Sequence, residues 1–371
     1  MDRETMGWFF LSLIAAENEG KSLEILKQLE IGEVMELKGK DLYDFGIAAD
    51  LKEAADFDRL NNPALLQECW EEVQERDVRF ISRADSDFPE GFLQLPDPPA
   101  GIYVRGKMAP EEMPKVSIVG SRRCTNYGKE SAFFFGKELA LSGVHIVSGM
   151  ALGIDGHAER GAIAASDMLY GSGDRVPVTT AILGGGPDLC YPKSNIELYQ
   201  NILDGGGCIL SEKPPGYQAR AYDFPRRNRL ISALGTCLAV IEAAERSGTR
   251  TTVDFALSLG REVFAVPGRI GERMSGGCNE LIKSGAQILT CPEDILQYLG
   301  LQVREDRKKP VRLVLSPEEK EIYSCIREDP VTVDDLLLRC NFPVSMLLEI
   351  LVRLEIRGAI RKSPLSGYVR A

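Results

Sequence analysis

The sequence predicts an α/β protein: a doubly wound (extended Rossmann-like), mostly parallel sheet, flanked in the chain by an N-terminal helical domain and a C-terminal winged-helix domain. Between residues 116 and 299, short apolar runs alternate with helical patterns, as in βαβ units. Before residue 76, apolar positions recur at helical spacing. After residue 312, three helical patterns precede two strand-like segments. The 371 residues suffice for two or three domains.

Residues 1–75 are expected to form a small helical (SAM or helix-hairpin-helix-like) domain. Their 18 acidic and 7 basic residues give a net charge of −11, which is the charge of the whole chain. This acidity favours an accessory or protein-contacting role over a contact with DNA. The helices are expected at Trp8–Ala16, Ser22–Leu29, Val34–Leu37, Asp41–Phe45, Ile47–Ala55 and Ala64–Glu75.

Residues 76–300 are expected to form the sheet domain. Two short strands, Val78–Ser82 and Ile102–Val104, come first, and the proline-rich stretch Phe88–Ala100 between them should be extended. The polar segment Ser166–Pro177 is expected to be a surface loop. Parallel strands are expected at Val116–Val119, His145–Val147, Thr180–Leu183, Cys208–Leu210, Leu238–Ile241, Val263–Val266 and Gln287–Leu289. The helices between and after them are expected at Tyr127–Ser142, Ile154–Ala165, Ser194–Leu203, Arg226–Ala233, Thr251–Leu259, Gly277–Ser284 and Pro292–Leu299.

Residues 301–312 are charged and predict a linker, and residues 313–371 predict a winged-helix domain. The third expected helix is mostly apolar and offers few groups that read bases. A protein contact is therefore favoured over DNA reading for this domain. Its helices are expected at Pro317–Glu328, Val333–Arg339 and Pro343–Arg357, and its wing at Gly358–Arg361 and Gly367–Arg370.

The composition is that of an ordinary soluble protein, with 44% hydrophobic and 27% charged residues. The apolar run Trp8–Ala16 is too short to span a bilayer, and acidic residues precede it where a secretory signal needs basic ones. We therefore expect a cytoplasmic protein without a membrane contact. Nine cysteines without metal-ligand spacing and two histidines predict no metal site, and no cofactor is expected.

Polar loops follow five of the expected parallel strands. The carboxyl ends of parallel strands meet at one edge of a sheet, so these loops should lie together. Their glycines, hydroxyls and basic groups suit a phosphate chain longer than a dinucleotide. Between residues 213 and 250, seven basic residues outnumber three acidic ones. The loops cover residues 120–122, 148–155, 184–195, 211–229 and 242–250.

Individual side chains in these loops leave alternatives open. Tyr191 either stacks on bases or packs beneath a loop, and packing is favoured for Phe224. Asp155 is expected to cap the following helix. Glu242 is either a catalytic group or a partner of Arg227 or Arg229. No Walker A sequence, dinucleotide-binding glycine motif or catalytic triad is present.

Six motifs resemble those of the DNA-processing protein A family (DprA, also called Smf). They are Val-Gly-Ser-Arg at 119–122, Ser-Gly-Met-Ala-x-Gly-Ile-Asp at 148–155, Gly-x-Asp-x-x-Tyr-Pro-x-x-Asn at 186–195, Phe-Pro-x-Arg-Asn-Arg-x-Ile-Ser at 224–232, Ser-Gly-Thr at 247–249 and Val-Pro-Gly at 266–268. The sequence departs from the family at Leu152, where arginine is usual, and at residues 156–159. The flanking domains also look like the family's modules.

The resemblance implies a single-stranded DNA-binding protein that protects incoming DNA in natural transformation and loads the RecA recombinase. It also implies a homodimer through the sheet domain and no catalysis. Arg122 and Lys193 would be the main phosphate contacts. The groove would be lined by Gly120, Ser121, Tyr191, Asn195, Lys213, Arg227, Asn228, Arg229 and Thr249.

The alternative is a nucleotide-processing enzyme of the phosphoribohydrolase (lysine-decarboxylase-like) type, with Glu242 as its catalytic group. The Pro-Gly-Gly-x-Gly-Thr motif of that family is missing, and Ala233-Leu234-Gly235-Thr236 lacks its glycine cluster.

Overall fold

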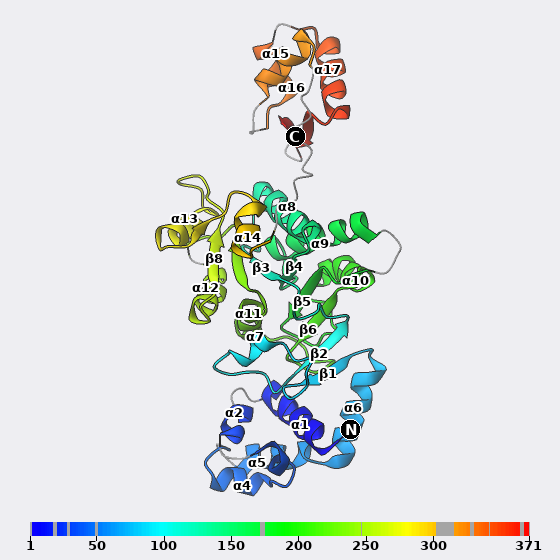
Figure 1. Cartoon of the computed structure of the whole chain (residues 1–371), viewed down its shortest axis with the longest axis vertical. Coiled ribbons are helices and arrows are strands. Elements are labelled where there is room, and N and C mark those ends of the chain that lie inside the picture. Colours follow the sequence, from blue (N-terminus) through cyan, green and yellow to red (C-terminus); the bar gives the residue numbers. More distant parts are fainter. Residues whose placement is uncertain are drawn as a thin grey trace. The chain divides into compact units, whose positions relative to one another are not determined.

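In a computed structural model, the protein forms two compact units, Met1–Val303 and Arg304–Ala371 (Figure 1). The structure describes residues 2–17, 21–27, 30–48, 51–170, 175–245, 247–301, 315–326, 330–340, 342–363 and 367–370. Apart from Leu301, the linker predicted at 301–312 lies outside the described residues.

A nine-stranded sheet forms the centre of the first unit, with the order β1-β2-β6-β5-β4-β3-β7-β8-β9. Strands β3 to β9 are parallel, whereas β1 and β2 are antiparallel. Strand β3 pairs with both β4 and β7, so the order of the strands reverses there. The doubly wound, mostly parallel sheet is thus confirmed. The strands are Arg79–Ser82 (β1), Gly101–Gly106 (β2), Lys115–Val119 (β3), His145–Ser148 (β4), Thr179–Leu183 (β5), Cys208–Ser211 (β6), Cys237–Val240 (β7), Glu262–Ala265 (β8) and Gln287–Ile288 (β9).

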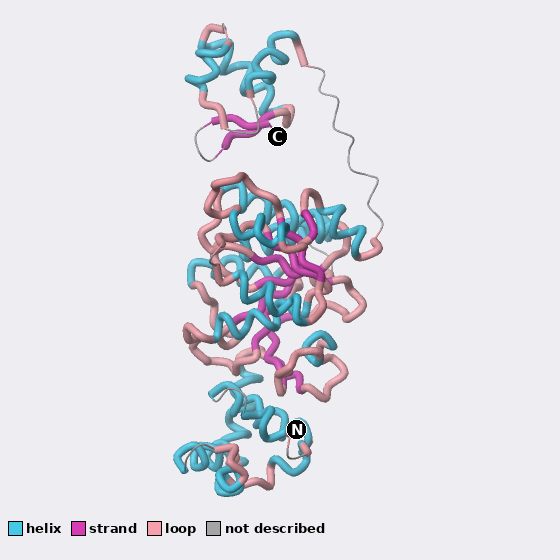
Figure 2. Tube along the Cα trace, turned by 90° about the vertical axis from the view of Figure 1, so that its left-hand side faces the viewer, coloured by secondary structure: helices cyan, strands magenta, loops and turns pink. Residues whose placement is uncertain are grey.

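Helices cover both faces of this sheet (Figure 2). One face packs against α8 (Asn126–Leu141), α9 (Ile154–Tyr170) and α14 (Pro292–Tyr298). The other face packs against α7 (Glu90–Leu93), α11 (Asp223–Leu234), α12 (Thr249–Ser258) and α13 (Gly276–Lys283). The short helix η1 (Lys193–Asn195) leads into α10 (Ile196–Asp204), which packs beside α9. Burial from both sides explains why strands β3 to β7 are rich in apolar residues on both faces.

Two segments of the sheet domain differ from the prediction. Helix α9 continues to Tyr170 instead of ending at Ala165, because residues 166–170 contain no glycine or proline and Ser166 is buried. Residues 171–174 of that predicted loop lie outside the described residues. The proline-rich stretch is not wholly extended, since Pro89 precedes the short helix α7. That helix inserts Phe92 into the core beside Phe88, with ring centroids 5.9 Å apart.

The N-terminal helices share a core with strands β1 and β2. Phe9 of the first helix packs against Phe80 and Tyr103, with ring centroids at 5.2 and 6.3 Å. The Ser12 hydroxyl lies 2.7 Å from the Tyr103 hydroxyl. Residues 1–75 and the sheet therefore belong to one compact unit. The helices are Arg3–Glu17 (α1), Lys21–Leu26 (α2), Ile31–Val34 (α3), Gly39–Asp44 (α4), Leu51–Leu60 (α5) and Pro63–Glu75 (α6).

Several expected boundaries in this region were wrong; α1, for example, begins at Arg3 and not at Trp8. Helix α3 ends at Val34, where the expected helix begins, and its capping carboxylates are Glu30 and Glu33. Helix α5 begins at Leu51, while Ile47 and Ala48 are buried non-helical residues. Short helices of this kind depend on tertiary packing, which propensity alone does not report. Residues 28, 29, 49 and 50 of the expected helices lie outside the described residues.

The second unit is a winged helix, as predicted. Strands β10 and β11 pair antiparallel from Ile360↔Arg370 to Ser363↔Gly367, which forms the wing. The core of the unit includes Ile322, Leu336, Leu347 and Leu354. The elements are Pro317–Cys325 (α15), Val333–Arg339 (α16), Val344–Ile356 (α17), Ile360–Ser363 (β10) and Gly367–Arg370 (β11). Residues 327–329, where the first helix was expected to end, lie outside the described residues.

None of the helices formed by the described residues is long and apolar enough to cross a membrane. Within the same part of the chain, no group of three or more His, Cys, Asp or Glu side chains is arranged to hold a metal ion.

We expect His145 to make the folded protein sensitive to acid. Its buried imidazole contacts the Pro177 carbonyl at 3.0 Å and the Thr180 hydroxyl at 2.8 Å. Burial lowers the pKa of His145 from 6.5 to about 4. Because the unfolded chain then binds a proton more readily, the stability contributed by the neutral ring is lost as the pH falls from 6.5 through 4. The loss is about 3 kcal/mol.

Urea unfolding of the protein and of His145→Gln at pH 7 and pH 4.5 tests this expectation. The free energy of unfolding should fall less steeply with acid in the variant. Equal slopes would contradict the assignment.

Candidate nucleic-acid interface

A pocket opens at the carboxyl ends of β3, β4 and β5, where the sequence predicted a binding edge. Its volume is about 70 Å³. The loops after these three strands and the first turns of α11 supply its walls. The lining residues are Arg122, Gly149, Ala151, Leu152, Tyr191, Pro192, Phe224 and Arg227.

Arg122 is the exposed cation of this pocket. Its guanidinium carbon lies 5.4 Å from the centre of the Phe224 ring, a cation–π distance. No carboxylate of the described residues lies within salt-bridge distance of it. The loop is held in place because Ser121 N–H donates to the Glu242 carbonyl at 2.7 Å. A Cβ at Gly120 would lie 2.6 Å from Ile154, so only glycine fits there.

Two aromatic rings form one wall beside Arg122. The Tyr191 and Phe224 centroids are 5.1 Å apart, with the rings tilted by 36°. Tyr191 is 53% exposed, whereas Phe224 is half-buried and packs against Gly184, where an added Cβ would come within 3.3 Å of the ring. Phe224 thus packs on a loop, as expected, and also contacts the pocket. Such an exposed aromatic surface next to a free guanidinium suits a nucleobase and its phosphate.

Lys193 and Asn195 lie on η1, directly after this wall, but in different environments. Lys193 is exposed. Asn195 is buried; its side-chain amide donates to the Met150 carbonyl at 2.8 Å and its oxygen accepts from Arg160 at 3.2 Å. Asn195 therefore ties the loop after β5 to the loop after β4.

Arg227 lies beneath the pocket and is only 6% exposed. It donates to the carbonyl oxygens of Gly149 (3.0 Å) and Ile182, and to the Asn228 side-chain oxygen at 3.3 Å. A Cβ at Gly149 would lie 2.6 Å from the guanidinium. Burial lowers the pKa of Arg227 to about 10, and the neighbouring Asp155 opposes this shift. Arg227 therefore acts as an internal support that joins the loop after β4 to strand β5.

Lys213, Arg229 and Thr249 are not brought into the pocket. The Lys213 ammonium is buried, donates to the Ala16 carbonyl at 2.9 Å and lies 3.5 Å from Asp223. Thr249, 8% exposed, begins α12. Arg246, in the preceding loop, lies outside the described residues.

Arg229 is the most deeply buried of the predicted contacts, at 2% exposure. It forms hydrogen bonds of 2.7 Å with both oxygens of Glu212 and an ion pair of 3.2 Å with Asp97. Burial raises the pKa of Glu212, but the nearby cations Arg229, Arg226 and Lys213 outweigh it and keep that pKa below its usual value. The charge of Arg229 is thus neutralised within the fold.

Glu242 supports a helix instead of contacting Arg227 or Arg229. One carboxylate oxygen accepts from the Thr125 N–H at 2.8 Å and the other from the Thr125 hydroxyl at 2.6 Å. Thr125 is the N-cap of α8, so Glu242 places negative charge at a helix N-terminus. A Cβ at Gly128 would lie 2.3 Å from the same carboxylate, so glycine is needed where α8 passes Glu242.

Sequence reasoning missed a buried acidic pair beneath the pocket. Asp155 is the second residue of α9 and so is not the expected helix cap; burial raises its pKa, and the charges of Arg227 and Arg122 oppose that shift. Glu159, one turn later, is fully buried and accepts from the Met150 N–H at 3.3 Å. Burial and the charge of Asp155 raise the pKa of Glu159. The sequence signal that could have revealed this pair is the four-residue spacing, which places both side chains on one face of a helix.

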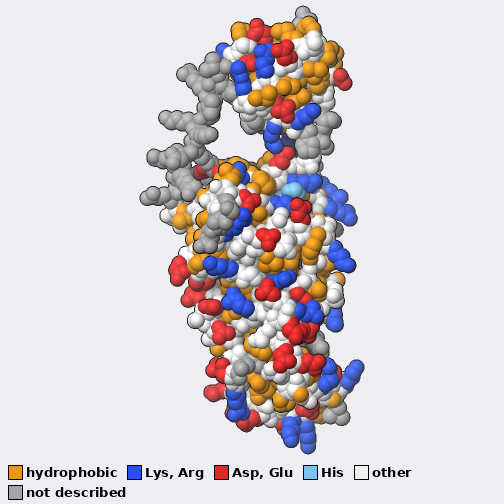
Figure 3. Space-filling view, turned by 90° about the vertical axis from the view of Figure 1, so that its right-hand side faces the viewer, with side chains coloured by type: hydrophobic (Ala, Val, Ile, Leu, Met, Phe, Trp, Pro, Cys, Tyr) orange, Lys and Arg blue, Asp and Glu red, His pale blue; other side chains and the backbone are white. Residues whose placement is uncertain are grey.

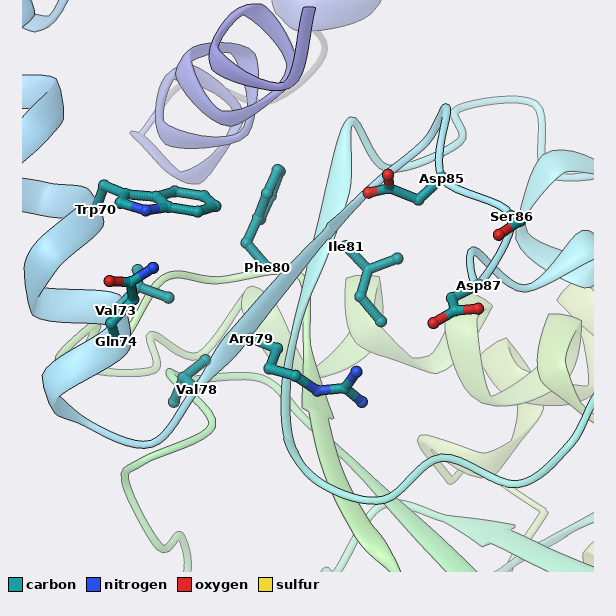
Figure 4. Close-up of a pocket in the computed structure, with 10 residues that line it drawn as sticks. All are labelled: Trp70, Val73, Gln74, Val78, Arg79, Phe80, Ile81, Asp85, Ser86 and Asp87. Carbon is teal, nitrogen blue, oxygen red and sulfur yellow. The ribbon is translucent and has the colours of Figure 1, made fainter. Parts of the chain in front are cut away.

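A second pocket, of about 380 Å³, lies beside the edge strand β1, away from the predicted loops (Figure 4). Trp70 and Phe80 form an apolar side, and Arg79, Asp85 and Asp87 supply charges. Trp70 also packs against Phe9 in the shared core, with centroids 5.2 Å apart. No residue of the candidate DNA-binding set lines this pocket.

Comparison with known proteins identifies the family to which the chain belongs. Residues 79–300 match the family described as DNA recombination-mediator protein A, and residues 307–364 match the DprA winged helix domain. The protein Smf of Escherichia coli is 36% identical over 310 residues, which are 81% of this chain and 79% of Smf. The DNA processing protein DprA of Streptococcus pneumoniae is 34% identical over 284 residues, which are 74% of this chain and 92% of the relative.

Two solved structures of DNA processing proteins are similar to this chain. The X-ray structure of DprA from Streptococcus pneumoniae has a TM-score of 0.65 at 28% identity and covers 82% of this chain and 99% of its own. A structure of DNA processing protein A from Helicobacter pylori is described as giving insights into a unique single-stranded DNA binding mode. It has a TM-score of 0.51 at 30% identity, and the match covers 60% of this chain and 95% of the Helicobacter pylori chain.

Fold and pocket together define a Rossmann-like protein with a winged-helix unit and a candidate binding site at the strand ends. The chain belongs to the DNA recombination-mediator protein A (DprA, or Smf) family.

Proposed function

We propose that the protein binds single-stranded DNA at the carboxyl edge of its sheet. The observation that carries this proposal is the pocket in which exposed Arg122 lies over Phe224, next to exposed Tyr191. A strand with unstacked bases can place a base on these rings and a phosphate on the guanidinium, which a duplex cannot do. The Helicobacter pylori relative, described as binding single-stranded DNA, supports the same ligand.

We assign the predicted residues to two roles. Arg122 and Lys193 contact phosphates, Tyr191 stacks on a base, and the backbone of Gly120 and Ser121 approaches the strand. The other residues support the loops from within the fold: buried Asn195, Lys213, Arg227, Arg229 and Thr249, and half-buried Asn228.

We further propose the biological role that the family resemblance implies. The protein protects incoming DNA in natural transformation, loads the RecA recombinase onto it in the cytoplasm, and catalyses no reaction. We assign Glu242 a structural role, because each of its carboxylate oxygens accepts a hydrogen bond from Thr125, the N-cap of α8.

A homodimer through the sheet domain belongs to this proposal. Strand β9 is the last strand of the sheet and pairs on one side only, with β8. Ile288 on this strand is 54% exposed, and Ile270 and Tyr298 nearby in sequence are 100% and 46% exposed. An open strand edge with apolar side chains favours pairing with a second copy.

Gel-shift titration with a 40-nucleotide single strand and the matching duplex tests the proposed ligand. We expect the single strand to be bound at a protein concentration at least tenfold lower than the duplex, because only unpaired bases reach the Tyr191 ring. Assembly of RecA on strands coated with single-strand-binding protein should become faster when this protein is added. Equal affinity for the two DNA forms would contradict the proposal.

A further inference from the structure

Helix α17 of the winged-helix unit has two apolar faces, and the fold uses only one of them. Leu347, Ile350, Leu351 and Leu354 are fully buried in the core of the unit. A second set lies on the outside: Val344, Leu348, Val352 and Ile356, with exposed fractions of 53%, 42%, 50% and 80%.

These four exposed residues, which we call the α17 row, are spaced by four positions. Side chains at this spacing lie next to one another along a helix and form a continuous ridge. Figure 3 shows hydrophobic side chains gathered on the surface of this unit. A ridge of large apolar groups on a solvent-facing helix marks an interaction site. It does not suit DNA, because it offers no group that hydrogen-bonds to a base edge.

The charges next to the row indicate which partner fits. Glu349 and Arg353 lie beside the α17 row on the same helix. The Arg353 guanidinium is 3.6 Å from the Glu349 carboxylate, and the two side chains form an exposed ion pair. A two-fold axis that crosses the helix reverses its direction but keeps each flank on the same side. Such an axis places Glu349 of one copy beside Arg353 of the other, and this contact occurs twice.

We propose that the α17 row binds a second copy of this chain, with the two α17 helices antiparallel. Leu348 of one copy then faces Val352 of the other, and Val344 faces Ile356. A single helix row buries less than the roughly 800 Å² per partner of a stable interface. The contact is therefore weak by itself and becomes effective where another contact already holds two chains together.

Charge reversal in the full-length protein tests the pairing. Glu349→Arg and Arg353→Glu, each alone, bring like charges together and should weaken self-association at least tenfold in sedimentation velocity runs over a concentration series. An equimolar mixture of the two variants restores both contacts, so its self-association should return to that of the unchanged protein. Lys320→Glu on α15 is the matched control, because it makes the same change in charge as Arg353→Glu at an exposed site off the row.

Photo-cross-linking distinguishes this contact from pairing through the sheet edge. A photoreactive phenylalanine analogue at Ile356 should cross-link to a peptide of another chain that contains Val344. Unchanged association in both single variants, together with no cross-link to that peptide, would reject a second copy as the partner of the row. Gel shifts of single-stranded DNA with the same proteins report separately on the pocket. If the unchanged protein gives the cross-link but does not bind single-stranded DNA, the result counts against the proposed function alone.

Discussion

Reversing the charges of Arg122 and Lys193 together should weaken the binding of single-stranded DNA on the order of a hundredfold at about 0.1 M salt. Both side chains are exposed, and no described carboxylate forms an ion pair with Arg122. If each contacts one phosphate, their loss releases fewer counterions on binding. The slope of log K against log salt concentration should therefore fall by about one to two units, for all DNA sequences alike.

Fluorescence anisotropy at several salt concentrations measures both quantities. Lys107→Glu with Lys283→Glu is a matched control, since both lysines are exposed and lie away from the carboxyl ends of the parallel strands. Lys107 follows β2, next to the start of β6, and Lys283 ends α13, before β9. The control should bind DNA nearly as well as the unchanged protein. A salt slope unaltered by the change at Arg122 and Lys193 would place the phosphate contacts on another surface.

Arg229→Met should lower the free energy of unfolding by about 3–5 kcal/mol. Arg229 is 2% exposed and neutralises Glu212 through two hydrogen bonds of 2.7 Å. Without it, the largely buried carboxylate of Glu212 loses its closest cation, and burying an unpaired charge is costly. Urea unfolding at pH 7 gives the free energy directly.

The paired variant Glu212→Leu with Arg229→Met should recover much of this loss, because no charge is then left unpaired. Arg250→Met, at an exposed arginine on α12, should change the stability by less than about 0.5 kcal/mol. If Arg229→Met unfolds normally yet fails to bind DNA, Arg229 contacts the strand and the support role proposed for it is wrong.

The sheet and the polar loops at its carboxyl edge could be predicted from the sequence because each depends on a local pattern. Apolar runs such as Val116–Val119 and Cys208–Leu210 are buried from both sides, so their composition alone reports the strand. The loop Gly120-Ser121-Arg122 follows a strand directly, which fixes it at the carboxyl edge.

Which basic residues face solvent could not be predicted in this way. Arg122, Arg227 and Arg229 all follow sheet strands, yet only Arg122 is exposed. Arg229 is buried because Glu212 and Asp97, far from it in the chain, converge on its guanidinium. Such pairing depends on tertiary structure and leaves no periodic signal in the sequence.

The hydrogen bond from Lys213 to the Ala16 carbonyl bears on how the sheet depends on residues 1–75. The Lys213 side chain, which follows β6, donates to a carbonyl in the last turn of α1, and Asp223 in α11 balances its charge. A buried hydrogen bond thus joins the acidic helices to the sheet, beside the hydrophobic core that they share. Without residues 1–75, the Lys213 ammonium would lose its carbonyl partner but keep Asp223 as its counter-ion, so the sheet would lose a hydrogen bond without burying an unpaired charge.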